Sequence, residues 1–258
     1  MAVAKPLPVF ITGASRGIGA ATAREFAKRG HPVALSARGT DAIEKLAQEI
    51  RAAGGTAIAV PCDVGDPGAV ERAIAGTVAQ LGGLGIVVNN AGTIEPLARI
   101  ADADMRQWAR AMEVNLNGPI YVMHYAAPHL PKGGVVINIT SGAAERAQTG
   151  RSAYCASKAG LMIASRIFAV EESQTRGIRV IGFSPGYVDT EMNALNREHR
   201  MGNAGNINPA DLRPPEETAK LIAWLAGPEA DRLNGTIVTA REPDIRRAAG
   251  VAMLPESR

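Results

Sequence analysis

Short apolar runs alternate along the chain with longer segments in which apolar residues recur at helical spacing. The short runs predict seven buried strands, at residues 8–13, 32–37, 56–61, 84–89, 134–140, 178–183 and 235–240. The longer segments predict helices at residues 17–30, 41–55, 67–81, 102–131, 152–176 and 216–226. Because strands joined by crossover helices pair in parallel and are covered on both faces, we expect one doubly wound α/β domain over residues 1–258.

One stretch interrupts this alternation. Residues 187–215 contain several glycines and prolines and no clear period, and irregular loops of this length inside a compact domain are usually functional. We therefore expect a lid before the last helix and strand. The side chains expected to face a substrate from it are Tyr187, Met192, Leu195 and Met201.

Composition narrows the class of protein. The chain has 258 residues, 46% of them hydrophobic and 21% charged, which is enough to bury a core without disulfides. Cys62 and Cys155 are far apart, and neither they nor the histidines have the spacing of metal ligands. We expect no metal site and a reducing, cytoplasmic location. The net charge of +3 without a block of Lys and Arg does not indicate a nucleic-acid partner, and no apolar run approaches the ~20 residues of a membrane span.

The turn "TGASRGIG" at 12–19 joins the first predicted strand to the first predicted helix. In open α/β sheets ligands bind outside the carboxyl ends of the strands, where this turn lies. Gly13 allows a tight turn, and Gly17 and Gly19 let the backbone approach a pyrophosphate at the helix N-terminus. The spacing is G-x-x-x-G-x-G rather than G-x-G-x-x-G. On these residues alone, a glycine-rich turn without a ligand remains an alternative.

Further motifs follow in a fixed order: "NNAG" at 89–92, Asn115, Ser141, "YCASK" at 154–158 and "PG" at 185–186. Together with the glycine turn, they resemble the short-chain dehydrogenase/reductase family in order and spacing from about residue 8 to 190. The resemblance implies a Rossmann-type fold and oxidoreduction of carbonyls and alcohols with NAD(H) or NADP(H). The substrate is then expected to be a small molecule, an uncharged or moderately apolar ketone or aldehyde.

The resemblance also implies the residues of the cofactor site. Asp63 and Val64 would flank the adenine, the "NNAG" motif would support the central sheet beside the cofactor, and the "PG" turn would lead to contacts with the nicotinamide carboxamide. The implied set is Gly13, Ser15, Arg16, Gly17, Ile18, Gly19, Arg38, Asp63, Val64, Asn90, Ala91, Gly92, Tyr154, Lys158, Pro185, Gly186, Val188 and Thr190.

Arg38, directly after the second predicted strand, bears on the choice between the two cofactors. In this fold a carboxylate at the end of that strand binds the ribose 2′-OH of NAD, whereas an arginine accommodates the 2′-phosphate of NADP. Ala37 stands at the expected carboxylate position, and Arg16 is a plausible second cation. A guanidinium matches a phosphate bidentately, so we predict NADP(H). An arginine that merely solvates the strand end is the alternative.

The predicted catalytic residues are Asn115, Ser141, Tyr154 and Lys158. Tyr154 and Lys158 share one face of a helix, so the ammonium can lower the pKa of a phenol that is otherwise a poor base. Ser141, at a strand end, would orient the substrate oxygen, and Asn115 would hold a water in a proton relay. The alternatives are a surface Tyr/Lys pair, a capping serine and a buried asparagine satisfied by backbone. Substrate contacts are predicted for Ser141, Gln148, Tyr187 and Met192.

Other functions on the same fold remain open. A catalytically silent NADP(H)-binding sensor would not need all four catalytic residues. A 3-oxoacyl thioester reductase would use Lys132 and Arg176 toward an acidic carrier. A sugar-nucleotide epimerase usually needs a longer chain. The stretch "GTIVTAREPDIRRAAG" at 235–250 departs from the family's usual ending. The resemblance still implies an interface formed by helices 102–131 and 152–176, and with it a homodimer or homotetramer.

Overall fold

The computed structural model describes residues 6–199 and 211–254. Their strands form one parallel sheet in the order β3-β2-β1-β4-β5-β6-β7, which confirms the predicted α/β fold class. The strands are β1 (Val9–Thr12), β2 (Val33–Ala37), β3 (Ala57–Pro61), β4 (Ile86–Asn89), β5 (Val135–Ile139), β6 (Arg179–Ser184) and β7 (Ile237–Thr239). Each lies within a residue or two of a predicted run. The five inner strands β2, β1, β4, β5 and β6 are almost entirely buried, as expected for a parallel sheet covered on both faces, whereas the edge strands β3 and β7 are partly exposed.

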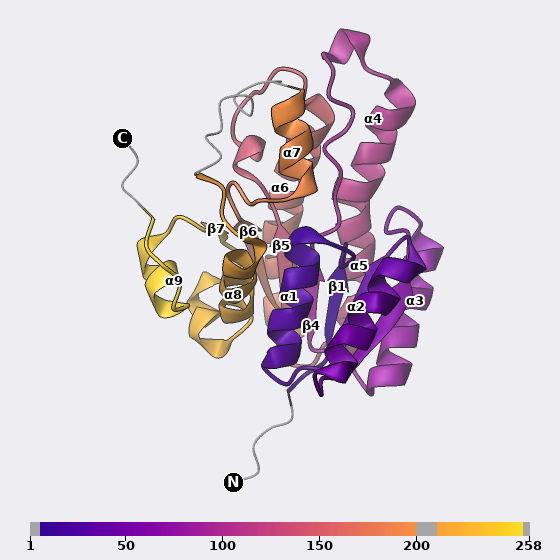
Figure 1. Ribbon diagram of the computed structural model, residues 1–258. Coiled ribbons are helices and arrows are strands. Elements are labelled where there is room, and N and C mark those ends of the chain that lie inside the picture. Colours follow the sequence, from indigo (N-terminus) through magenta and orange to yellow (C-terminus); the bar gives the residue numbers. More distant parts are fainter. Residues whose placement is uncertain (1–5, 200–210, 255–258) are drawn as a thin grey trace.

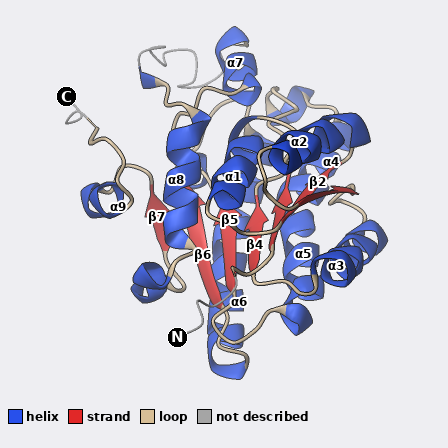
Figure 2. Ribbon diagram, turned by 60° about the horizontal axis from the view of Figure 1, so that its bottom comes forward, coloured by secondary structure: helices blue, strands red, loops and turns tan. Residues whose placement is uncertain are grey.

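Helices cover both faces of the sheet (Figures 1 and 2). They are α1 (Gly17–Lys28), α2 (Thr40–Ala52), α3 (Pro67–Leu81), α4 (Met105–Met112), α5 (Gly118–Ala126), α6 (Ser152–Thr175), α7 (Glu191–Glu198), α8 (Pro215–Leu225) and α9 (Pro243–Ala248). Helices α1, α2 and α8 lie on one face, and α3, α5 and α6 lie on the other. The layers match a doubly wound domain.

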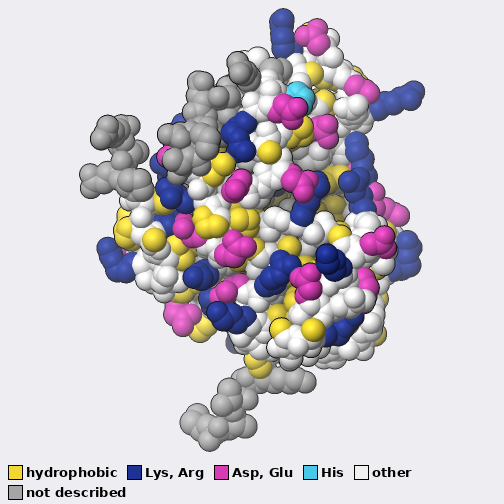
Figure 3. Space-filling model, in the orientation of Figure 1, with side chains coloured by type: hydrophobic (Ala, Val, Ile, Leu, Met, Phe, Trp, Pro, Cys, Tyr) yellow, Lys and Arg dark blue, Asp and Glu magenta, His cyan; other side chains and the backbone are white. Residues whose placement is uncertain are grey.

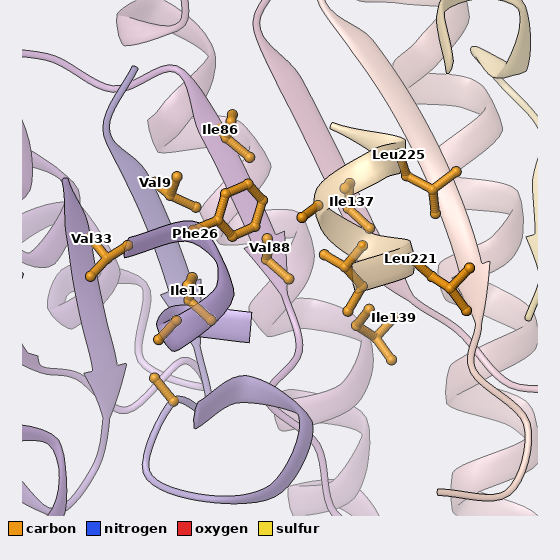
Figure 4. Packing of buried hydrophobic residues seen from close by; sticks show 14 of the residues in the cluster. Val9, Ile11, Phe26, Val33, Ile86, Val88, Ile137, Ile139, Leu221 and Leu225 are labelled. Carbon is orange, nitrogen blue, oxygen red and sulfur yellow. The ribbon is translucent and has the colours of Figure 1, made fainter. Parts of the chain in front are cut away.

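Two apolar cores hold the helices to the sheet. On the α1 and α8 side, Phe26, Leu221 and Leu225 lie over apolar side chains of β1, β4 and β5 (Figure 4). On the other side, Phe10 and Val87 point away from that core and pack with α3, α5 and α6. Successive residues of a strand point to opposite faces, so the same short runs supply both cores.

Three segments differ from the predicted elements. The helix expected over 102–131 is interrupted by a π-helical turn at Glu113–Asn117 between α4 and α5. The stretch 187–215, expected to be irregular, contains α7, whose first turn is capped by the Thr190 hydroxyl. Helix α9 was not predicted. Met201, expected to face the substrate, lies outside the described residues.

Two helices carry exposed apolar side chains at the surface where a homo-oligomer interface was predicted. Helices α5 and α6 expose the large apolar side chains Ile120, Ile163, Ile167 and Val170. The predicted homo-oligomer remains a prediction.

Lys and Arg are intermixed with Asp and Glu on the face of the molecule seen in Figure 3. Within residues 6–199 and 211–254, no helix combines the length and the apolar character needed to cross a bilayer.

Gly19 tests how tightly α1 is seated against the sheet. A Cβ at this position would lie 2.2 Å from the Gly13 carbonyl oxygen. Although alanine is favoured over glycine inside helices, the clash should dominate, so Gly19→Ala should lower the free energy of unfolding by roughly 1–3 kcal/mol. Urea denaturation measures this change. The matched control is Gly76→Ala in α3, where the nearest atom is 3.9 Å away and a gain of up to about 1 kcal/mol is expected. Equal stabilisation by both substitutions would contradict this packing.

Candidate active site

A cleft of about 2020 Å³ opens at the carboxyl edge of the sheet. Its walls come from the segments that follow β1 to β6 and from the start of α6. The strand order reverses between β1 and β4, so the loops after these two strands diverge and leave room for a ligand. Helix α7 lies above this edge, at the top of Figure 1.

The glycine turn is held to the centre of the sheet. Gly13 and Gly17 have φ values of +65° and +55°, which favour glycine. Asn90, after β4, donates from Nδ2 to the carbonyls of Thr12 at 3.0 Å and Gly13 at 3.1 Å. The Thr12 hydroxyl in turn accepts the backbone N–H of Asn90 at 3.0 Å. The "NNAG" motif thus fixes the shape of the turn.

The residues predicted from the turn do not all face the cleft. Ser15, Arg16, Gly17 and Ile18 line it. Gly19 does not, because it packs against the Gly13 carbonyl. Its small size is therefore explained by close approach of α1 to the turn rather than by approach to a pyrophosphate.

The far end of the cleft carries the predicted cofactor-selecting residue. Arg38 is exposed and lines the cleft beside Ala37. Among the described residues it forms no ion pair, whereas Arg16 pairs with Glu191 at the start of α7. That pair is mostly exposed, and such surface pairs are worth about 0–1 kcal/mol. Arg16 can therefore exchange partners at low cost.

The Asp63 carboxylate forms an ion pair with an arginine that the sequence did not indicate as its partner. It pairs with Arg110 of α4, at 2.5 Å from Oδ1 to Nη2, and accepts the Gly65 N–H at 3.0 Å. Burial raises the pKa of Asp63, but the hydrogen bonds and the positive charges of Arg110 and Arg38 outweigh burial and hold it below the ordinary value. Arg110 thus takes up most of the Asp63 charge, so Arg38 can meet an anion.

The first two turns of α6 bury a phenol and an ammonium together. Tyr154 is 8% and Lys158 is 3% exposed. The Lys158 Nζ donates to the Ile139 carbonyl at 2.7 Å and lies 5.9 Å from the centre of the Tyr154 ring. Both side chains line the cleft. The structure therefore brings together the predicted Tyr/Lys pair, and a surface location is excluded.

Burial shifts the pKa of both groups. It lowers the pKa of Lys158 to about 8 and raises the pKa of Tyr154, although the Ser141 hydroxyl and the Arg151 guanidinium partly offset the latter. At neutral pH the phenol is therefore protonated and the amine is largely charged. This is the state in which a phenol can donate a proton to a substrate oxygen.

Asn115 lies within the π-helical turn and is fully buried. Its Oδ1 accepts the Thr93 N–H at 2.8 Å, and its Nδ2 donates to the Thr93 carbonyl at 2.8 Å and to the Ser157 hydroxyl at 3.2 Å. A Cβ at Gly92 would lie 3.3 Å from Asn115 Oδ1 and 3.8 Å from Lys158 Nζ. The backbone of Thr93 thus satisfies hydrogen bonds of the Asn115 side chain, which agrees with the alternative of a buried asparagine satisfied by backbone. The side chain nevertheless lies on the same side of Gly92 as the Lys158 ammonium.

The remaining predicted site residues line the same cleft, with Ser141 at the end of β5 and with the substrate positions among them. They are Ser141, Val64, Ala91, Gly92, Gln148, Pro185, Gly186, Tyr187, Val188, Thr190 and Met192. The basic residues considered for a carrier protein do not line it. Lys132 and Arg176 precede β5 and β6, at the opposite edge of the sheet.

Arg110 and Arg151 also line the cleft and were not among the site residues predicted from the sequence. Arg151 immediately precedes α6, and its guanidinium carbon lies 5.1 Å from the centre of the Tyr154 ring. Its position three residues before the tyrosine was visible in the sequence. Whether that side chain turns inward or outward depends on the preceding loop, which has no periodic pattern.

Glycine turn, cleft and Tyr/Lys pair together define a nucleotide-dependent oxidoreductase of Rossmann type. The family model of short chain dehydrogenases matches residues 8–201, and the chain belongs to the short-chain dehydrogenase/reductase family. Members of this family bind a nicotinamide cofactor.

Individual members of the family match this protein over most of its length. It is 36% identical to the cis-4-hydroxycyclohexanecarboxylate dehydrogenase of Sinomonas cyclohexanicum, over 88% of this chain and 92% of that protein. It is 32% identical to the cyclohexanol dehydrogenase of an Acinetobacter strain, over 88% and 90%. The structure matches that of a short chain dehydrogenase from Burkholderia cenocepacia in complex with NADP, at TM-score 0.82 and 32% identity, over 91% and 96% of the two chains.

Burial of Lys158 should make stability depend on pH. Its pKa is about 8 in the folded protein against 10.5 ordinarily, so between these values the unfolded chain binds a proton that the folded protein has lost. Stability therefore rises with pH in this window. The variant Lys158→Met carries no buried charge. Its free energy of unfolding relative to the cofactor-free wild type should be most favourable at pH 7 and should decline between pH 8 and pH 10.

Chemical denaturation across this pH range measures the difference. Loss of the hydrogen bond to Ile139 adds an offset that does not vary with pH. Lys45→Met, on the exposed side of α2, is the control and should show a flat difference. An equally flat difference for Lys158→Met would refute the buried charge.

Proposed function

We propose that this protein is an NADP(H)-dependent oxidoreductase that interconverts secondary alcohols and ketones. The observation that carries the proposal is the joint burial of Tyr154 and Lys158 in the cleft that also contains the glycine turn. A protein that only bound the cofactor would have no use for a desolvated ammonium next to a protonated phenol, because burying an unpaired charge is costly.

The residues present fit a dinucleotide. Gly13 and Gly17 have positive φ values and no Cβ, so they leave the backbone accessible at the N-terminus of α1, where N–H groups favour a pyrophosphate. We propose that the bound dinucleotide lies along Ser15, Val64, Ala91 and Thr190. When bound, the nicotinamide cofactor supplies or accepts the hydride.

The chain's own residues move the proton. In reduction, Tyr154 donates its proton to the carbonyl oxygen as negative charge develops there, and Ser141 holds that oxygen by a hydrogen bond. Lys158 then stabilises the phenolate. Asn115 fixes the Thr93 backbone beside the Lys158 ammonium, and we propose that this side of Gly92 is the route by which the proton is replaced. In oxidation the same residues act in reverse.

NADP(H) is the proposed cofactor because the cleft presents Arg38 without a carboxylate at Ala37 and without a competing ion pair among the described residues. Asp63, an acid in the cleft wall whose charge interacts with that of Arg38, is engaged by Arg110. An arginine at this position accommodates the 2′-phosphate, and Arg16 is proposed as a second contact. The related Burkholderia protein is in complex with NADP.

The proposed substrates are cyclic ketones and the matching secondary alcohols. Around Tyr154 the wall is largely apolar, with Ile94, Ala143, Met192 and Leu195 packed about the phenol and lining the cleft. Two relatives are named for alcohols on a six-membered ring, cyclohexanol and cis-4-hydroxycyclohexanecarboxylate. An apolar wall with a hydroxyl donor at one point suits a saturated ring bearing one oxygen.

Oxidation of NADPH with cyclohexanone and other ketones tests the activity, and Tyr154→Phe tests the proton donor. A positioned general acid contributes about 10²–10⁴-fold, so kcat should fall by that factor while NADPH binding, followed by fluorescence titration, persists. Tyr125→Phe, on α5 away from the cleft, is the control. NADPH binding without turnover of any ketone would favour a silent sensor, and full activity in Tyr154→Phe would refute the assignment.

Arg38→Asp tests cofactor selection. Loss of a charge-assisted hydrogen bond costs about 1.5–3 kcal/mol, and 1.4 kcal/mol is tenfold. The ratio of kcat/KM for NADPH to that for NADH should therefore fall by roughly tenfold to hundredfold. Lys45→Asp on α2 makes the same charge change outside the cleft and should leave the ratio unchanged. A wild-type preference for NADH would overturn the proposed cofactor.

A further inference from the structure

Arg151 is the second buried cation beside the reactive phenol. Its side chain is 7% exposed, and the residue lines the cleft immediately before α6. Its guanidinium carbon lies 5.1 Å from the centre of the Tyr154 ring. The backbone of Arg151 bridges to Ala98, in the segment after β4. It therefore lies on the wall built after β4 and β5, whereas the glycine turn follows β1.

The hydrogen bonds of this guanidinium are incomplete. Nη1 donates to the Gln148 side-chain oxygen, while the buried Nε has no partner. Among residues 6–199 and 211–254, no carboxylate forms an ion pair with Arg151. An uncompensated buried charge is destabilising unless something binds it.

Arg246 shows how the same chain satisfies an arginine that has only a structural role. It is 1% exposed, pairs with the Glu217 carboxylate at 2.5 Å, and donates to the Ala240 carbonyl at 2.8 Å and to that of Ala252. Arg151 has one neutral acceptor instead. The contrast indicates that the missing partner of Arg151 is an anion that is not part of the protein.

The position of Arg151 at the start of α6 adds to this field. The N-terminus of a helix carries a partial positive charge, where cations are unfavourable and anions are stabilised. Guanidinium and helix terminus thus favour the same ligand. A carboxylate is planar and matches the two-pronged geometry of a guanidinium, and it fits an otherwise apolar wall better than a larger anion does.

We propose that Arg151 binds a carboxylate on the substrate, so that the preferred substrates are oxo acids and hydroxy acids on a ring. This rests on the proposed ketone reductase activity. The ketone carbon gains the hydride that reduced nicotinamide supplies, and its oxygen gains the Tyr154 proton. The carboxylate stays ionised throughout and takes no part in the reaction. Arg151 therefore selects and orients the substrate.

The test compares 4-oxocyclohexanecarboxylate with the neutral 4-oxocyclohexanecarboxamide, using wild type, Arg151→Gln and Arg72→Gln. Wild type should prefer the carboxylate in kcat/KM by about tenfold to hundredfold, as for a charge-assisted contact. In Arg151→Gln this ratio should collapse toward one, mainly through KM for the acid. Arg72 is an exposed arginine on α3 that does not line the cleft, and its substitution should leave the ratio unchanged.

The outcomes separate this inference from the proposed function. Turnover of cyclohexanone without preference for the carboxylate would overturn only the carboxylate site, whereas no turnover of any ketone would overturn the oxidoreductase proposal. Equal losses for both substrates in Arg151→Gln, with a shifted pH profile, would mean that Arg151 acts only on Tyr154.

If Arg151→Gln does not fold, a measurement on wild type alone still tests the carboxylate site. Cyclohexanecarboxylate should inhibit cyclohexanone reduction at least about tenfold more strongly than cyclohexanecarboxamide does. Equal inhibition by the acid and the amide would contradict the carboxylate site.

Discussion

Parallel pairing of β1 with β4 is the constraint on which the site depends. In this register Val9, Phe10 and Ile11 lie opposite Ile86, Val87 and Val88, so both strands end at the same level. Asn90 can then hold the Thr12 and Gly13 carbonyls. Gly19, with no Cβ, lets α1 close onto the turn. A slip of one residue would reverse every side chain between the two cores and would separate the glycine turn from its clamp.

A second consequence of the fold is the low dielectric around Tyr154. Helix α6 begins beneath the segments after β4 and β5, so its first two turns are buried together with two cations, Arg151 and Lys158. In such an environment charges act more strongly than they do in water. Burial keeps the phenol protonated, and the cations limit the cost of the phenolate. Arg151, Tyr154 and Lys158 thus lie within about two turns at the start of α6.

Much of this arrangement is predictable from sequence because it depends on local patterns. Apolar runs specify β1 to β7, and the Tyr154/Lys158 spacing places both side chains on one helix face. The Arg110–Asp63 pair joins residues 47 positions apart, and no local pattern encodes such a contact. The helix α7 was obscured by the glycines and prolines around it. The orientation of Arg151 and the π-helical turn at Asn115 depend on tertiary packing, which no local sequence pattern encodes.

The proposed function depends on hydride transfer inside this cleft. The most direct test of this transfer uses NADPH that carries deuterium at both C4 positions, cyclohexanone as the substrate, and mass spectrometry of the alcohol formed. Hydride transfer from the cofactor predicts one deuterium on the carbinol carbon of every cyclohexanol formed. Alcohol without deuterium, or no alcohol from protein that binds the labelled NADPH, would contradict it.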